Sequence, residues 1–283
     1  MTKKEADQEW FVQGEPVYYA HRLSPLLNEL KIIPISDVHR GNPLFSVKHL
    51  DRTLDMIASD EEIYTILNGD LCEAALKTSK GEIYHQVGSP QEQRDWMIDR
   101  LTPIRQKILG MTMGNHEYRI YKETGIDICK DIAKALNVPY RAEGIILKIM
   151  FGSGNNRTPK RPYTYWGYAT HGYGGARTKS AKAVKAERAG HWIPKMDFII
   201  MSHDHTVNVA PDVCLMTDPR TRVDKETGFM VGKVVAHRRM LVKSNAYLKW
   251  GGYSEMGGFP PVDLEAPIIK LSGTGKPRVR VEV

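Results

Sequence analysis

Three short apolar runs, separated by helical segments, constrain the fold of this chain more than any other feature. They are Lys31–Ile35, Ile63–Leu67 and Ile108–Met113, and each has the length and composition of a buried strand. The order strand, helix, strand, helix, strand is typical of an α/β fold. We therefore expect an α/β sandwich.

The two connecting segments have helical signals of their own. After Ser46, apolar residues recur on one helical face, at Val47, Leu50, Leu54 and Ile57. In the second connection, Ser89 to Glu92 forms a capping box with proline at the first helical position. This second helix should bend or end before Pro103, because proline removes a backbone donor and clashes with the preceding turn.

The second half of the chain is richer in strands. We expect them at Gly144–Phe151, Tyr163–Thr170, Phe198–Ser202 and Val231–Leu241. A loop, Gly152–Pro162, and one helix, Lys179–Ala189, interrupt this series. Because no linker is visible, we predict a single domain over 31–283, preceded by an N-terminal appendage at 1–30.

Polar residues that can bind metal ions follow most of these strands. The first three strands lead to Asp-x-His, Gly-Asp and Gly-Asn-His-Glu; later strands lead to Thr-His-Gly and Ser-His-Asp-His. The residues concerned are Asp37, His39, Asp70, Asn115, His116, His171, His203 and His205. The carboxyl ends of strands in an open α/β sheet share one edge, where ligands bind. These residues can therefore meet in one cleft.

The types of these residues point to divalent metal ions. Carboxylate, imidazole and amide oxygen suit Mn²⁺, Fe²⁺ or Zn²⁺. A carboxylate such as Asp70 can bridge two ions, and ions about 3.5–4 Å apart assist phosphoryl transfer. Each motif alone is more often a turn, a helix cap or an ordinary histidine. The ordered combination, each motif behind an expected strand, carries the prediction.

This ordered set resembles the calcineurin-like metallophosphoesterase superfamily over residues 31 to about 206. The resemblance implies a four-layer α/β/β/α sandwich, in which two sheets are flanked by helices. It also implies a metal site of two ions, of which Mn is the first choice and Fe or Zn are alternatives. Asp37, His39, Asp70 and His205 would hold the first ion, and Asp70, Asn115, His171 and His203 would hold the second.

The same resemblance gives His116 a catalytic role. It would protonate the leaving group or stabilise the transition state, and either role suits an imidazole near neutral pH.

The chain departs from the family pattern at three positions. Ser202 stands where glycine usually precedes His-x-His, and its small side chain should preserve the turn. Ala74 replaces the arginine of protein serine/threonine phosphatases, which argues against a phosphoprotein substrate. Glu117 replaces the aspartate usual in DNA-repair nucleases, which weakens a nuclease assignment without excluding it. The C-terminal segment around Trp250 and a closing strand pair look similar to phage and prophage members.

A basic segment lies between two of the ligand motifs. The chain has a net charge of +7, and Arg177, Lys182 and Lys185 stand in or beside the expected helix at Lys179–Ala189. Lys182 and Lys185 share a helical face. We expect these three residues to contact substrate, and a polyanion such as nucleic acid would suit them. The alternative is an ordinary solvated helix face.

The amino-acid composition is typical of one class of protein. Apolar residues make up 41% of the chain and charged residues 26%, as in a soluble globular protein. Three widely spaced cysteines and the absence of a signal-like or membrane-spanning run favour a reduced, cytoplasmic compartment with no membrane partner.

We therefore predict a cytoplasmic enzyme that hydrolyses phosphate esters with two metal ions. Phosphodiesters, including nucleic acid, are the expected substrates. The alternatives are a small-molecule phosphomonoesterase and a non-catalytic nucleic-acid-binding scaffold, which metal content and turnover would separate. The oligomeric state has no signal in the sequence.

Overall fold

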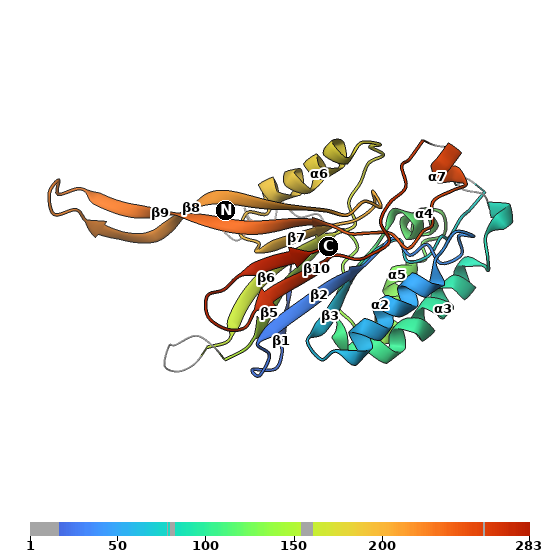
Figure 1. The fold of residues 1–283 in the computed structure, drawn as a ribbon, viewed down its shortest axis with the longest axis horizontal. Helices are drawn as coiled ribbons and strands as arrows, with labels where there is room; N and C mark the ends of the chain where they lie inside the picture. The colour runs from blue at the N-terminus through green and yellow to red at the C-terminus, as the bar shows by residue number, and fades with distance from the viewer. Residues whose placement is uncertain (1–16, 78, 80–82, 154–160, 257) are drawn as a thin grey trace, which may run out of the picture.

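The structure is a computed structural model that describes residues 17–77, 79, 83–153, 161–256 and 258–283. Two β-sheets pack face to face, and helices lie on the outer sides of both (Figure 1). The predicted four-layer α/β/β/α sandwich is therefore confirmed.

The five-stranded sheet contains the three apolar runs predicted to be strands. Its order is β11-β10-β2-β3-β4. The runs form β2 (Glu29–Ile35), β3 (Ile63–Asn68) and β4 (Ile108–Thr112), which are mutually parallel. The closing strand pair, β10 (Ile268–Ser272) and β11 (Val279–Glu282), is antiparallel. Because β2, β3 and β4 are parallel, their carboxyl ends lie at one edge.

The six-stranded sheet has the order β1-β5-β6-β7-β9-β8. Its strands are β1 (Tyr18–Arg22), β5 (Ile145–Phe151), β6 (Tyr163–Thr170), β7 (Phe198–Met201), β8 (Asn208–Val223) and β9 (Met230–Lys243). The strands β6, β7 and β9 are parallel, so a second set of carboxyl ends shares an edge.

Apolar side chains fill the space between the sheets and beneath the helices. Alternate residues of β2 face opposite ways: Leu30 and Ile32 pack between the sheets, whereas Ile33 and Ile35 pack under helices. Burial on both faces explains why this strand reads as a continuous apolar run.

Helices α2 (Val47–Ser59), α3 (Pro90–Leu101) and α5 (Ile128–Leu136) cover the outer face of the five-stranded sheet. The predicted capping box of α3 is present, and the helix passes into the 3₁₀ turn η2 (Thr102–Lys107) before Pro103. Helix α6 (Lys179–Trp192) packs on β7 and β9 through Ala186 and Ala189. The short elements are η1 (Ile83–His85), α4 (Asn115–Thr124) and α7 (Tyr253–Met256).

Part of the predicted N-terminal appendage belongs to a sheet. Tyr18–Arg22 forms β1, which pairs in parallel with β5 at the sheet edge. Residues 1–16, and residues 154–160 of the predicted loop at Gly152–Pro162, lie outside the described part of the chain. The division into an appendage and one domain stays a prediction.

The β8–β9 hairpin extends beyond the sandwich as a long two-stranded arm (Figure 1). Its inner part packs against the sheets and α6. Farther out, Leu215 is 76% exposed and Val234 is 63% exposed. The outer part of the arm therefore lies outside the apolar cores.

Candidate metal centre

Every predicted metal ligand lies just beyond the carboxyl end of a parallel strand. Asp37 and His39 follow β2, Asp70 follows β3, and Asn115 begins α4 after β4. From the second sheet, His171 follows β6, and His203 and His205 follow β7. Packing of the two sheets brings these two sets of loops together.

The ligand atoms converge in three overlapping groups. Within each group, one atom from every residue lies within 4.8 Å of the others. The groups are Asp37, His39 and His205; His39, Asp70 and His116; and Asp70, His171 and His203. Asp70 belongs to two of the groups, as expected of a carboxylate between two ions. Asn115 joins the third group, because its Oδ1 lies 2.6 Å from His203 Nδ1.

The backbone of these loops is strained. Positive φ angles occur at Asp37 (49°), His39 (50°), Asp70 (50°), His203 (72°) and His205 (55°). Such conformations are costly for residues other than glycine and concentrate at functional sites, where the surrounding structure holds them. The strain thus coincides with the predicted ligand set.

A glycine allows two of the loops to meet. A Cβ atom on Gly114 would lie 2.1 Å from both the backbone nitrogen and Oδ1 of Asp70. The absence of a side chain at Gly114 therefore permits the β4 loop to touch the β3 loop. This contact brings His116 N close enough to donate a hydrogen bond of 2.8 Å to Asp70 Oδ1.

The atoms in the centre are arranged as a cation would require. His39 Nε2 lies 3.2 Å from His205 Nε2, and His171 Nε2 lies 3.3 Å from His203 Nδ1. Asp37 Oδ1 is buried and has no hydrogen-bond partner. Converging imidazole nitrogens and an unsatisfied buried carboxylate oxygen are costly unless a positive charge lies between them. The residues therefore fit divalent metal ions.

Neighbouring acceptors orient the histidine rings. His171 Nδ1 lies 2.8 Å from Asn68 O, and His203 Nε2 lies 2.6 Å from Gly174 O. His39 Nδ1 lies 3.1 Å from Glu73 Oε2. In each ring, the second nitrogen remains directed at the cluster. Such outer contacts fix the tautomer and position of histidines that bind metals.

The carboxylates of the centre are ionised. Burial opposes ionisation of Asp37, but the interaction with His205, whose Nε2 lies 3.3 Å from Asp37 Oδ1, outweighs it and holds the pKa at about 2. Burial likewise opposes ionisation of Asp70, but His171 and His116 keep its pKa well below the usual value. Two buried negative charges in the same centre favour the binding of a cation.

His116 lies at the edge of the cluster. Its Nδ1 is 2.7 Å from Glu73 O, and its Nε2 is 4.0 Å from Asp70 Oδ2. It is part of one group of possible metal ligands, so its position suits both ligation and proton transfer. Its catalytic role stays a prediction.

Glu117 supports the bridging loop, a role that sequence reasoning missed. Its carboxylate accepts hydrogen bonds from the backbone N–H groups of Asp70 (3.1 Å) and Cys72 (2.9 Å). Burial and the charge of Asp70 raise the pKa of Glu117 to about 7. The signal available in the sequence was its place directly after Asn115 and His116, where it was interpreted only as a departure from the family.

Two lysines of α6, Lys182 and Lys185, face the His-x-His loop. Lys182 is 3% exposed, and its Nζ donates to Asp204 O (2.9 Å) and Thr206 Oγ1 (2.7 Å). Lys185 Nζ donates to Asp204 Oδ1 at 3.2 Å. These partners give both lysines a role in holding the His-x-His loop. Lys182 also lines the cavity at the metal centre, and Arg177 is exposed, so contact of these three residues with substrate stays a prediction.

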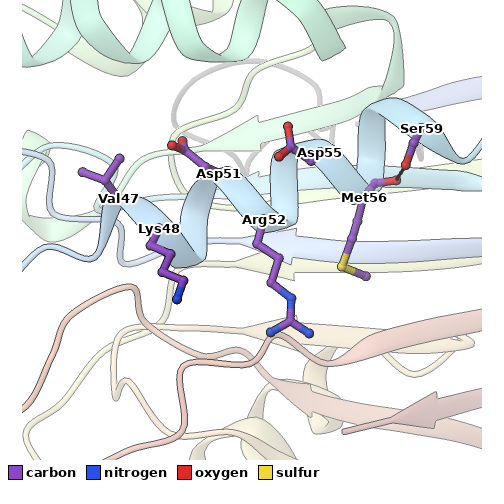
Figure 2. Close-up of a pocket in the computed structure, with 7 residues that line it drawn as sticks. All are labelled: Val47, Lys48, Asp51, Arg52, Asp55, Met56 and Ser59. Atoms are coloured by element: carbon purple, nitrogen blue, oxygen red, sulfur yellow. Dashed lines mark hydrogen bonds between the residues drawn. The ribbon is translucent and has the colours of Figure 1, made fainter.

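The centre opens into a cavity of about 1200 Å³. The residues that line it include residues of the centre and of the C-terminal segment: His39, Asp70, Asn115, His116, His203 and His205, and Leu248, Trp250, Met256, Phe259 and Val262. A separate depression of about 750 Å³ follows the surface of α2, with Lys48, Arg52 and Met56 among the residues that line it (Figure 2). It contains none of the predicted ligands.

A bovine protein described as a transmembrane protein with metallophosphoesterase domain is similar in sequence. It is 30% identical over 99 residues, which is 35% of this chain and 19% of the bovine protein. The assembled residues are those that the resemblance to the calcineurin-like metallophosphoesterase superfamily picked out in the sequence. The likeness spans about a fifth of the bovine protein's length, and no family model matches the chain.

Two solved structures are similar at low TM-scores. A predicted phosphoesterase from Streptococcus pneumoniae is 9% identical, with a TM-score of 0.37, over 90% of this chain and 99% of its own. Vps29 complexed with zinc, from Entamoeba histolytica, is 10% identical, with a TM-score of 0.35, over 89% and 98%.

The chain thus has a buried cluster of histidine and aspartate residues that can bind metal ions. The identity of the metal stays a prediction. Within the described residues, no helix is long and apolar enough to cross a membrane.

Proposed function

We propose that this chain is a calcineurin-like metallophosphoesterase that hydrolyses phosphodiesters. The observation that carries the proposal is the convergence of seven predicted ligands, with Asp70 shared, at one end of a large cavity. Asp37, His39, Asp70 and His205 would hold one divalent ion; Asp70, Asn115, His171 and His203 would hold the other. When bound, the pair supplies an activated water and neutralises charge on the phosphate. The P–O bond to one ester group then breaks, and that group leaves as an alcohol.

His116 supplies the proton to the departing oxygen. Its Nδ1 lies 2.7 Å from Glu73 O, so the ring donates its Nδ1–H to this carbonyl. The remaining nitrogen, Nε2, carries the transferable proton when the ring is charged. His116 lines the cavity, and such proton transfer contributes about 10²–10⁴-fold to rate.

Two features favour a diester over a phosphoprotein. The cavity of about 1200 Å³ has room for groups on both sides of a phosphate. Ala74, where protein phosphatases have an arginine, is fully buried with a φ of 45°. No basic side chain from that position can therefore reach a phosphoprotein.

Nucleic acid is the polymeric diester that we propose as substrate. The support is the net charge of +7 and the exposed guanidinium of Arg177, which is next to the cavity-lining Ala176. Each lysine or arginine that contacts a phosphate adds about 0.7–0.9 to the salt slope of binding. Arg177→Ala should lower this slope, and an unchanged slope would argue against this contact.

A substrate panel with added Mn²⁺ tests the proposal. It compares a bis-aryl phosphodiester, an aryl phosphomonoester, cyclic nucleotides, RNA, and single- and double-stranded DNA. We expect the diesters to have the higher kcat/KM. A consistent preference for the monoester would favour a small-molecule phosphatase. No turnover despite full metal content would favour a non-catalytic scaffold.

A further inference from the structure

The residues of the C-terminal segment that line the cavity form an apolar wall, which differs in chemistry from the metal centre. Leu248, Trp250, Met256, Phe259 and Val262 contribute apolar side chains to the cavity. The acidic residues among those that line the cavity, Asp70, Glu73 and Asp204, lie outside this segment. A ligand bound in the cavity therefore meets both metal ligands and apolar surface.

This apolar wall is tied to the metal centre through the backbone. Tyr247 N donates to Asp37 O at 3.0 Å, so the strained ligand loop and the start of the wall are hydrogen-bonded. Two residues farther along the chain, Lys249 N donates a hydrogen bond of 2.9 Å to Leu44 O. The wall thus has a fixed position relative to the ligand Asp37.

The indole N–H of Trp250 is already hydrogen-bonded within the protein. Its Nε1–H donates to Phe259 O at 2.8 Å, which holds the indole against the loop. The side chain is nevertheless 45% exposed. Phe259 lies next to it along the same wall, with the Arg177 guanidinium 5.8 Å from the centre of its ring. An oriented, partly exposed indole with no donor to offer is suited to stacking.

We infer that Trp250 selects substrates whose ester group carries a planar aromatic ring, such as a nucleobase. This inference rests on the proposed function, because the phosphate of the same molecule must lie at the metal centre. Stacking of a base on an aromatic side chain is sequence-tolerant, since every base has a π face. The phosphodiesterase would therefore prefer substrates that carry an aromatic ring, but it would not distinguish one nucleobase from another.

Binding of phosphonates tests the inference without turnover. Benzylphosphonate, cyclohexylmethylphosphonate and methylphosphonate carry the same charged group, and their C–P bonds resist hydrolysis. Titration calorimetry with the full, Mn²⁺-loaded chain should give benzylphosphonate an affinity about 5–150-fold above methylphosphonate, the range measured for base stacking. Cyclohexylmethylphosphonate should bind more weakly than benzylphosphonate, because it is apolar but not planar.

Substitutions assign the preference to one side chain. Trp250→Ala should bring the benzyl-to-methyl affinity ratio close to one, and Trp250→Phe should retain most of it. Trp192→Ala is the matched control, because Trp192 is 59% exposed at the end of α6 and does not line the cavity. Its ratio should equal that of the wild type. Metal content measured on each variant verifies that the centre is intact.

The outcomes separate this inference from the proposed function. Equal affinities for the three phosphonates, a ratio unaffected by Trp250→Ala, or no measurable binding would overturn the role of Trp250. Equal affinities for the benzyl and cyclohexylmethyl compounds would mean that any apolar group binds as well as an aromatic ring. This result would also overturn the role of Trp250. Failure to hydrolyse phosphodiesters would overturn the proposed function, whatever the phosphonates show.

Discussion

At the scale of single residues, the centre has geometry that a bound cation makes favourable. Imidazole nitrogens face one another, Asp37 has an unsatisfied oxygen, and five ligand positions adopt positive φ. Strain of this kind costs on the order of 1–3 kcal/mol per residue and persists where surrounding contacts impose it. Residues around the ligands should therefore matter as much as the ligands.

His116→Ala should keep the metal ions and lower turnover by about 10²–10⁴-fold, because the proton donor is lost while the seven predicted ligands remain. The loss should be smaller for substrates with good leaving groups, which need less protonation. Elemental analysis and kcat/KM across a leaving-group series measure both effects. A variant that lost its metals, or that kept full activity on poor leaving groups, would assign this residue a different role.

Glu117→Ala should destabilise the protein, because it leaves the buried backbone N–H groups of Asp70 and Cys72 without an acceptor. An unsatisfied buried donor costs about 1–3 kcal/mol. Urea unfolding of the metal-free protein measures the loss. Glu117→Gln keeps one acceptor oxygen and should lose less, so equal losses in the two variants would refute the hydrogen-bond explanation.

At the scale of elements, α6 turns two of its lysines toward the His-x-His loop. Lys182 is buried against Asp204 and Thr206, and Lys243 from β9 also donates to Asp204 Oδ2, at 2.5 Å. The loop that bears His203 and His205 is thus held by lysines from two elements.

Lys182→Ala should lower the free energy of unfolding by about 1–3 kcal/mol, since two internal hydrogen bonds and buried volume are lost. Lys179→Ala is the matched control, because Lys179 is exposed on the same helix. It should change stability by less than about 0.5 kcal/mol. Equal effects of the two substitutions would mean that Lys182 has no internal role.

Apolar runs and a capping box in the sequence predicted several strands and one helix at their observed positions. The strands β2, β3 and β4 were predictable because they are buried on both faces, and α3 because Ser89 and Glu92 form a capping box. The strands β1 and β8 were missed because half-exposed strands with interspersed polar residues have no distinct pattern.

The seven ligand positions were visible as ordered motifs, but Glu73, Glu117 and Asp204 were not assigned. Their contacts depend on how loops from different strands pack. Lys182 is buried because of the face that α6 turns toward its sheet. The sequence of α6 has no distinct apolar stripe that would predict this face.

At the scale of the whole molecule, two sheets and the loops between them form the centre, while the β8–β9 arm lies apart from it (Figure 1). Leu215→Ser with Val234→Ser should change the free energy of unfolding by less than about 0.5 kcal/mol per site, because both side chains are mostly exposed. Metal content should not change. Urea unfolding that reported a loss of several kcal/mol would place the outer arm within the cooperative core.

The central claim is that Asp70 is shared by two metal ions that the chain needs for hydrolysis. Its carboxylate lies 3.1 Å from His171 Nε2 and 3.9 Å from His39 Nε2, which belong to different groups of ligands. The most direct test is elemental analysis of the Mn²⁺-loaded wild type and of Asp70→Asn, with phosphodiesterase activity measured on the same samples. We predict two ions per wild-type chain, and loss of most of the second ion and most of the activity in the variant. An active Asp70→Asn protein with two ions per chain would contradict the account.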